Sequence, residues 1–200
     1  MVVLKRLSHA LADRDHILAV IDGSAANHDG HSSGLSVPSR MAQEAAIRQA
    51  LSVAGVQGHE VDYVETHGTG TSLGDPIEAH ALAAIYGANR SASQPLVVGA
   101  VKTNIGHLES AAGIAGLIKA VLSLEHEQIP ANLHFREMNP HIDWAGVPVR
   151  IPVETVAWPR SGRRRRAGQE RRPGRPGGFP EGGRAEGSAP HDPRYGLVGC

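Results

Sequence analysis

Residues 61–79 read VDYVETHGTGTSLGDPIEA, and they contain the clearest pattern of secondary structure in the chain. Its first five residues, 61–65, are mostly β-branched or aromatic and predict a strand. A glycine-rich turn follows, and then a helix in which Asp75 is placed to cap the N-terminus and Pro76 occupies the first turn, where a missing amide hydrogen costs little. We expect this helix to end at Gly87. A strand, a tight turn and a helix in this order are typical of one unit of an α/β fold.

The same plan recurs in residues 96–125, LVVGAVKTNIGHLESAAGIAGLIKAVLSLE. This stretch predicts a strand at 96–101, a turn at 103–106 and a helix at 108–125. The segment 111–116 has almost no polar surface. Each glycine in a helix interior costs roughly 1 kcal/mol relative to alanine, so we expect a central, buried helix that another backbone approaches closely.

Further elements are expected on both sides of these two units. Strands are predicted at 2–4 and at 17–26, and the second ends in a turn at 27–30. Apolar residues spaced three and four apart predict an amphipathic helix at 39–54, and another strand is expected at 147–153. Strands that alternate with helices in this way predict an α/β layered fold.

The composition divides the chain into residues 1–159 and residues 160–200. With 200 residues and 40% apolar content, the chain is long enough for one sizeable core. The net charge is zero, yet residues 160–200 hold ten arginines against four acidic residues. This low-complexity Arg/Gly/Pro tail has too few apolar residues to offset the entropy of ordering it, so we expect disorder there. A frame shift in a GC-rich gene is a second interpretation of the tail.

Several functional classes are disfavoured by composition. A nucleic-acid-binding arm is disfavoured because the basic tail lacks aromatic stacking residues. A single cysteine, Cys200, excludes a disulfide framework, and neither an apolar leader nor a run of about 18 apolar residues is present. We therefore expect a cytoplasmic protein with no membrane partner.

The two glycine-rich turns each carry a histidine. His67 opens the first turn, whereas His107 closes the second, a few residues after Lys102. The glycines of residues 68–74 are spaced one residue too far apart for the dinucleotide fingerprint, and no Gly-Lys-Ser/Thr triplet makes a P-loop. No cysteine or His-Glu-x-x-His helix accompanies the histidines, so no metal site is predicted.

A different chemistry suits these residue types. A neutral imidazole donates a hydrogen bond to a carbonyl oxygen without burying a cation, and two such donors would form an oxyanion site for an enolate. Lys102 would bias the protonation of its neighbours. The alternative for either histidine alone is a satisfied buried side chain.

The two stretches resemble the β-ketoacyl synthase (ketosynthase) domain of modular type I polyketide synthases. The motifs that carry the resemblance are THGTGT with LGDPIEA after it, at 66–79, and VKTNIGHLE at 101–109. Weaker, collinear matches include residues 129–135 and 139–140. The resemblance extends over roughly residues 2–168 and corresponds to the later part of that domain.

The resemblance implies a thiolase-like layered fold, here partial, and decarboxylative Claisen condensation of an acyl thioester with a malonyl-type extender on an acyl carrier protein. His67 and His107 would be the catalytic histidines and Lys102 the supporting lysine. Thr69 and Thr71 would contact the phosphopantetheine arm that the carrier protein presents, although turn chemistry explains these threonines equally well. The family is homodimeric, and no directly bound cofactor is implied.

The resemblance also implies that the nucleophilic cysteine belongs to the earlier, N-terminal half of the domain. Cys200 lacks the surrounding motif, so we expect no nucleophile in this chain and no condensation by the chain alone. Two alternatives remain open: a non-catalytic module that binds the acyl carrier protein through its pantetheine arm, and an inert gene remnant.

Overall fold

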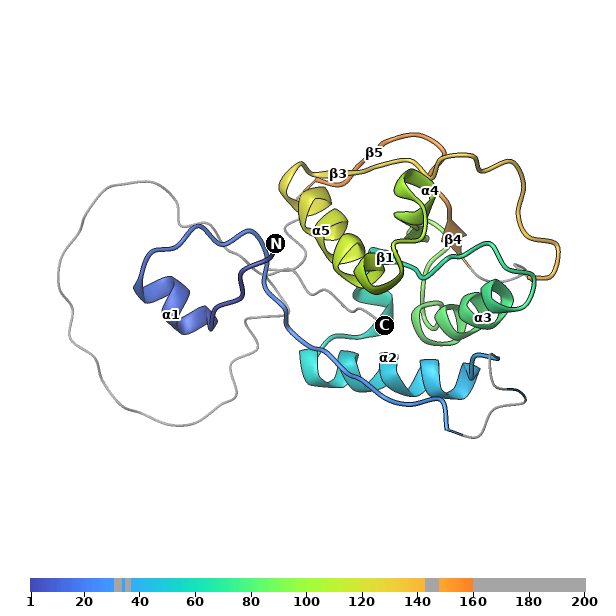
Figure 1. Cartoon of the computed structure of the whole chain (residues 1–200), viewed down its shortest axis with the longest axis horizontal. Coiled ribbons are helices and arrows are strands. Elements are labelled where there is room, and N and C mark those ends of the chain that lie inside the picture. Colours follow the sequence, from blue (N-terminus) through green and yellow to red (C-terminus); the bar gives the residue numbers. More distant parts are fainter. Residues whose placement is uncertain (31–33, 35–36, 143–147, 160–200) are drawn as a thin grey trace.

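The computed structural model describes residues 1–30, 34, 37–142 and 148–159 (Figure 1). Residues 160–200, where the sequence predicts disorder, lie outside the described residues. Within those ranges the chain forms five helices, two short 3-10 segments and five strands. No helix among the described residues is long and apolar enough to cross a membrane.

A parallel sheet lies at the centre of the structure. It contains β1 (Tyr63–Glu65), β2 (Leu96–Gly99) and β4 (Val149–Arg150) in the order β1-β2-β4, with all neighbours parallel. A separate antiparallel pair joins β3 (Gln128–Ile129) to β5 (Val156–Ala157). The expected strands at 61–65 and 96–101 are confirmed in shorter form. Parallel strands joined by helices also confirm the α/β fold class.

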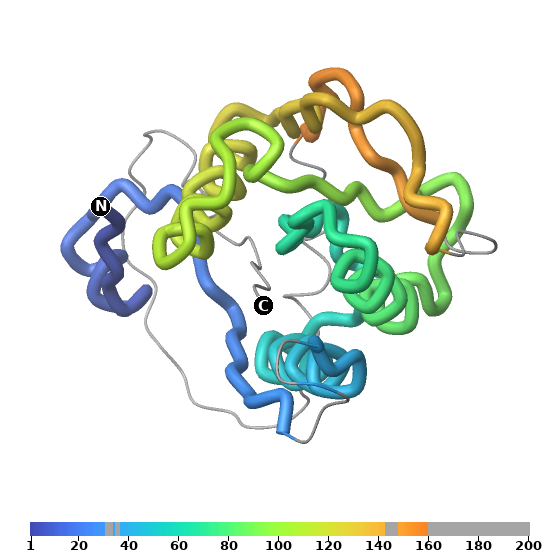
Figure 2. Tube along the Cα trace, turned by 45° about the vertical axis from the view of Figure 1, so that its right-hand side comes forward, coloured from blue at the N-terminus to red at the C-terminus, as the bar shows by residue number. Residues whose placement is uncertain are grey.

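Helices cover both faces of this sheet (Figures 1 and 2). On one face, α2 (Arg40–Ala54) and α3 (Gly74–Tyr86) pack together over β1 and β2. On the other, α5 (Ala112–Glu125) packs against β1. The side chains between the sheet and the α2–α3 pair form the main core: Ile47, Leu51, Val61, Val64, Leu82, Ile85, Tyr86 and Leu96.

Successive side chains of β1 point to opposite faces of the sheet, toward the α2–α3 pair and toward α5 in turn. Val64 enters the main core, whereas Tyr63 and Glu65 face α5. Tyr63 also packs against Trp158, with ring centroids 5.7 Å apart. The strand is therefore buried on both faces, as expected for a parallel strand between helical layers.

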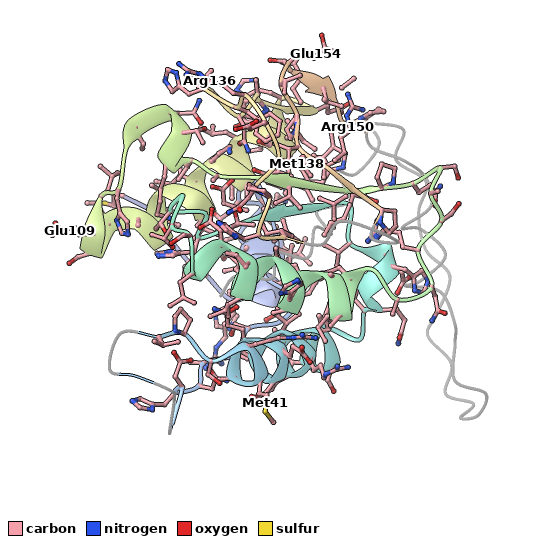
Figure 3. All side chains as sticks on the ribbon, turned by 90° about the vertical axis from the view of Figure 1, so that its right-hand side faces the viewer. Met41, Glu109, Arg136, Met138, Arg150 and Glu154 are labelled. Carbon is pink, nitrogen blue, oxygen red and sulfur yellow. The ribbon has the colours of Figure 1, made fainter. Side chains whose placement is uncertain are left out.

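The predicted helix at 39–54 forms as α2. The Oγ of Ser39 accepts a hydrogen bond from the backbone N–H of Ala42 at 3.3 Å, so Ser39 is a side-chain N-cap. Gly55 ends the helix in the left-handed region, with a φ of +67°. The outer face of α2 is solvated, and Met41 projects from it with 83% of its surface exposed (Figure 3).

The predicted strands at 2–4 and 17–26 are wrong. Residues 2–4 precede a short helix, α1 (Leu7–Ala12), and residues 17–26 run without any ladder partner among the described residues. The second segment instead passes close to α2, where a Cβ at Gly23 would lie 2.4 Å from the carbonyl oxygen of Ala50. A run of apolar, β-forming residues indicates an extended segment but supplies no neighbouring strand, and pairing is what makes a strand.

The predicted helix at 108–125 differs in its start and in its burial. A 3-10 turn, η2 (Glu109–Ala111), precedes α5, and the N-terminal half of α5 is not central, since Ile114 is 43% exposed. The expected close approach of another backbone is wrong: a Cβ at Gly116 would lie 3.0 Å from Cγ of the Glu65 side chain, and Gly113 has open space. The expected turn at 103–106 is one turn of helix, α4 (Lys102–Ile105).

Two further elements complete the described chain. The 3-10 segment η1 (Gly58–Glu60) leads into β1. The expected strand at 147–153 is confirmed only at β4, and Val147 lies outside the described residues. Arg90 joins η1 to the end of α3, because its guanidinium donates to the carbonyl oxygens of Gly58 and Tyr86 at 3.0 and 2.9 Å.

Candidate active site

The structure brings the two predicted histidines together. The ring centroids of His67 and His107 are 5.3 Å apart, with an angle of 81° between the ring planes. His67 follows β1, and His107 follows the short helix α4 after β2. Because β1 and β2 are parallel neighbours, both turns emerge at the same edge of the sheet. Pairing of β1 with β2 thus brings His67 and His107 together, although they lie 40 positions apart in the sequence.

The turn at His67 is held from α3 by a carboxylate. Glu78 accepts the backbone N–H of His67 at 2.7 Å through Oε1 and that of Gly68 at 2.9 Å through Oε2. Gly68 has a φ of +47°, and a Cβ there would lie 2.7 Å from Thr66 Oγ1 and 2.9 Å from the Cβ of Ala100. Both the backbone angle and the close approach require glycine.

Asp75 does not cap α3 as predicted. Its Oδ1 instead accepts the backbone N–H groups of Gly70 and Thr71, at 3.1 and 3.2 Å. The N-cap position is Leu73, which has no side-chain cap, and Thr71 Oγ1 accepts the N–H of Gly74 at 3.0 Å. The helix starts one residue before Asp75, so the carboxylate is free to turn back onto the glycine-rich loop.

The turn at His107 fixes the hydrogen position of that ring. Gly106 ends α4 with a φ of +76°, and the Nδ1 of His107 then accepts the backbone N–H of Glu109 at 2.9 Å. Glu109 itself points outward at the end of this loop (Figure 3). With Nδ1 engaged as an acceptor, a neutral His107 carries its proton on Nε2.

The surroundings of His67 favour its neutral form. Partial burial lowers the pKa of His67 below its ordinary value of 6.5, and the positive charge of Lys102 lowers it further. The charges of Glu78 and Asp75 act in the opposite direction. Lys102, half-buried at the start of α4, is thus close enough to influence the first histidine electrostatically.

The two predicted threonines are placed differently. Thr69 lines a cavity of about 240 Å³ beside His67, whose other walls come from the segment before α2, from α2 and from α3. Its lining residues are Pro38, Gln43, Ile47, His67, Thr69, Gly74, Asp75, Glu78 and Leu82. Thr71 is absent from this lining, and its hydroxyl serves the turn.

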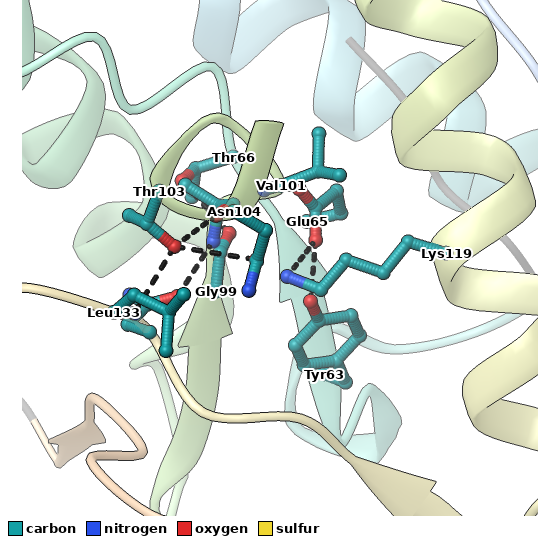
Figure 4. A network of polar contacts seen from close by, with 11 residues as sticks. Tyr63, Glu65, Thr66, Gly99, Val101, Thr103, Asn104, Lys119 and Leu133 are labelled. Carbon is teal, nitrogen blue, oxygen red and sulfur yellow. Dashed lines mark hydrogen bonds and ion pairs between the residues drawn. The ribbon is translucent and has the colours of Figure 1, made fainter. Parts of the chain in front are cut away.

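A second set of polar residues lies behind the two histidine turns, and no role for them was predicted from the sequence (Figure 4). Glu65 pairs with Lys119 at 2.9 Å, and their side chains are only 12% and 9% exposed. Asn132 Oδ1 accepts the N–H of Ala100 at 3.0 Å. A lysine inside the largely apolar helix α5 is the sequence signal that could have revealed the pair, since a buried lysine needs a partner.

Two further expectations from the sequence concern Cys200 and metal ligands. Cys200 lies outside the described residues. Within the ranges that the structure describes, no group of three or more histidine, cysteine, aspartate or glutamate side chains is arranged to hold a metal ion.

Comparison with known families identifies relatives of the chain. The family model described as "Beta-ketoacyl synthase, C-terminal domain" matches residues 18–136. A phenolphthiocerol/phthiocerol polyketide synthase from Mycobacterium tuberculosis is 54% identical over 168 residues, which are 84% of this chain and 9% of that protein. Erythronolide synthase EryA3 of Saccharopolyspora erythraea is 52% identical over the same length, or 5% of its own chain. The chain therefore spans less than a tenth of these curated relatives.

Solved structures agree with these matches. An oxazolomycin ketosynthase domain, OzmH KS7 from Streptomyces albus, superposes with a TM-score of 0.73 at 42% identity over 77% of this chain and 28% of that one. The ketosynthase from module 6 of the bacillaene synthase of Bacillus subtilis gives 0.73 at 38% identity over 78% and 28%.

Proposed function

Because this chain belongs to the β-ketoacyl synthase family, as a C-terminal ketosynthase domain of the polyketide synthase type, we propose that His67, His107 and Lys102 form the enolate-stabilising part of its active site. The observation that carries the proposal is the 5.3 Å separation of the two imidazole rings. In the proposed site one enolate oxygen accepts from a nitrogen of each ring, at the distance of about 2.7–3.1 Å that is typical of oxyanion donors.

The proposed reaction is decarboxylation of a malonyl-type thioester followed by Claisen condensation. The bond to the carboxylate breaks, carbon dioxide leaves, and the electron pair moves onto the thioester carbonyl oxygen as an enolate. The two imidazoles donate hydrogen bonds to that oxygen as its charge develops. The enolate carbon then attacks an acyl thioester, a carbon–carbon bond forms and the thiolate departs.

The protonation states derived above suit this role. A neutral His107 presents Nε2–H, because Nδ1 already accepts from Glu109. The lowered pKa of His67 keeps that ring neutral near pH 7, so it too donates without a buried positive charge. Lys102 contributes by its charge, which disfavours protonation of His67.

We also propose an acyl carrier protein as partner, with its phosphopantetheine arm entering beside Thr69. The cavity next to His67 combines a threonine hydroxyl with apolar walls from Ile47 and Leu82. Such a lining suits an arm that alternates amides with methylene groups. Thr71 would act by shaping the turn.

The acyl thioester that the enolate attacks is proposed to come from a cysteine in another part of the ketosynthase. In this chain the only cysteine is Cys200. The chain alone should therefore take no stable acyl group. Incubation with an acyl thioester followed by intact mass measurement tests this statement, and an adduct of the acyl mass would contradict it.

Binding of a substrate analogue tests the histidine roles directly. We would titrate the full chain with the ketone analogue of malonyl-pantetheine and follow the imidazole signals by NMR. Saturable shifts of both rings are expected, and His67→Gln or His107→Gln should weaken binding about two- to tenfold, from the net 0.5–1.5 kcal/mol of one neutral hydrogen bond. His9→Gln on α1 is the control. Unchanged affinity in both site variants would reject the proposal.

A non-catalytic carrier-binding module is the second candidate, because no cysteine is among the residues that line the cavity beside Thr69. It predicts saturable binding of holo-carrier protein that Thr69→Val weakens, together with no response of the His107 imidazole, which does not line that cavity, to the ketone analogue. A shift of the His107 signals on analogue binding would favour the catalytic site.

A further inference from the structure

The carboxylate of Glu65 uses both of its oxygens in the space between β1 and α5. Oε1 accepts the backbone N–H of Val101, and Oε2 accepts the hydroxyl of Tyr63 (Figure 4). The ammonium of Lys119 lies 2.9 Å from Oε2. Burial raises the pKa of Tyr63 well above its ordinary value, and the charge of Glu65 adds to this, so the phenol stays protonated and donates.

Glu65 joins the two segments that carry the histidines. It stands two residues before His67, and Val101 stands immediately before Lys102. The backbone bonds between β1 and β2 end with Thr66 N–H donating to the Gly99 carbonyl at 2.8 Å. Past that point, the Glu65–Val101 contact links the end of the first strand directly to the start of α4.

We propose that Glu65 is a positioning residue, which holds α4 against the end of β1 and so sets the spacing between His67 and His107, while Lys119 balances its buried charge. The importance of this spacing for catalysis rests on the function proposed above. The spacing itself is a property of the free protein, and it can be measured without any substrate.

The hydrogen-bonding capacity of the carboxylate explains why a glutamate stands here. It accepts two hydrogen bonds, from the Val101 amide and the Tyr63 hydroxyl, and it forms an ion pair with the Lys119 ammonium. A glutamine offers one acceptor oxygen and a donor NH₂ group, so one edge of its amide would face a donor as long as Lys119 is present. The glutamate and the lysine are therefore expected to depend on each other.

Replacing Glu65 alone would mix two effects, namely loss of the contact that positions α4 and burial of an unbalanced charge on Lys119. Glu65→Gln alone leaves the Lys119 ammonium buried without the carboxylate charge that balances it. Removing one partner of a buried pair is strongly destabilising, whereas replacing both is often neutral. The test therefore changes both residues together.

Two double variants of the full chain separate the roles. Glu65→Gln with Lys119→Met keeps an acceptor for the Val101 N–H, and the amide NH₂ is then free to donate to Tyr63. Glu65→Leu with Lys119→Met keeps a similar volume but removes that acceptor. Both lose the same two charges, so any difference between them in the titration of His67 reports geometry.

NMR of the imidazoles provides the readout. We expect the glutamine variant to retain the NOEs between the rings of His67 and His107 and the wild-type titration midpoint of His67. The leucine variant should lose those NOEs, and its His67 midpoint should move up toward 6.5, because Lys102 and His107 withdraw from the ring. Equal behaviour of the two variants, in either direction, would overturn the proposal.

A wild-type measurement covers the case in which neither variant folds. The Val101 amide hydrogen should exchange with solvent as slowly as the amides of β2, because the carboxylate shields it. Fast exchange at Val101 would overturn the proposal by itself. Failure of the proposed function would instead appear as loss of analogue binding with the titration and the NOEs intact.

Discussion

The carboxylate of Glu78 accepts the backbone N–H of His67 at 2.7 Å, so the first residue of the glycine-rich turn is held by the middle of α3. The second carboxylate oxygen holds Gly68 in the same way. The charge of Glu78 also favours protonation of His67 and partly offsets the effects of burial and of Lys102. One side chain thus sets both the position of this imidazole and part of its pKa.

Glu78→Gln should destabilise the protein by about 1.5–3 kcal/mol, the range for hydrogen bonds to a charged group, because the amide keeps only one acceptor for two N–H donors. Denaturant unfolding measures the change. Glu44→Gln on α2 is the matched control, since its pairs with Arg40 and Arg48 at the surface contribute about 0.3–0.5 kcal/mol. Equal losses in the two variants would show that the Glu78 contacts add nothing specific.

Lys102→Met should raise the pKa of His67. The positive charge of Lys102 lowers that pKa, but burial is the larger cause and stays in place, so the midpoint should remain below 6.5. NMR titration of the imidazole gives the midpoint directly. Lys5→Met, which removes a lysine paired with Asp13 and Asp15 near α1, should leave it unchanged. A fall in the midpoint on removing Lys102 would contradict the electrostatic account.

Acidification should destabilise the protein partly through His67. Its folded pKa lies below the unfolded value of 6.5, so the unfolded chain binds more protons between the two values and stability rises with pH across that window. The contribution is complete above 6.5 and is lost as the pH falls toward the folded pKa. His67→Gln should flatten this part of the stability curve, measured by denaturant unfolding at several pH values. Parallel curves would exclude the effect.

Gly68→Ala should cost about 1–3 kcal/mol from the left-handed backbone alone, with a further penalty from contacts with Thr66 and Ala100. Gly70→Ala is the control, since it has a φ of +77° but open space around its Cα. We expect the Gly68 variant to be the less stable of the two, and also to shift the His67 signals. Thermal unfolding and imidazole NMR would check both results, and equal stability would refute the packing argument.

Ser39→Ala should destabilise the protein by about 1 kcal/mol, the typical value of a serine N-cap. The hydroxyl satisfies the Ala42 N–H, one of the four unpaired donors at the start of α2. Ser52→Ala on the exposed side of the same helix should be neutral or slightly stabilising, because alanine has the higher helix propensity. Denaturant unfolding compares the two, and a neutral Ser39 variant would mean that the cap carries no net stability.

Local signals explain what could be predicted from the sequence. Ser39 and Gly55 bound α2 because capping and left-handed geometry depend on a few adjacent residues. The same local logic fails at Asp75, where the predicted cap is used by the preceding loop. It also fails at residues 17–26, because an extended, apolar segment becomes a strand only beside a partner. In both cases the error concerns which hydrogen-bond partner a group takes, and residues far away in the sequence determine that choice.

Local patterns in the sequence predicted the two motifs with their glycine turns, the ends of α2, the layered α/β fold class and the family that these motifs imply. The folded structure was needed to show that His67 and His107 lie with ring centroids 5.3 Å apart, that Lys102 influences the pKa of His67, and that Glu65 pairs with Lys119. The two kinds of feature differ in the range of the interactions that set them. Turns and caps depend on torsion angles and hydrogen bonds within a few residues, whereas electrostatic and hydrogen-bond partners across the sheet depend on strand order and register, which packing of the whole core selects.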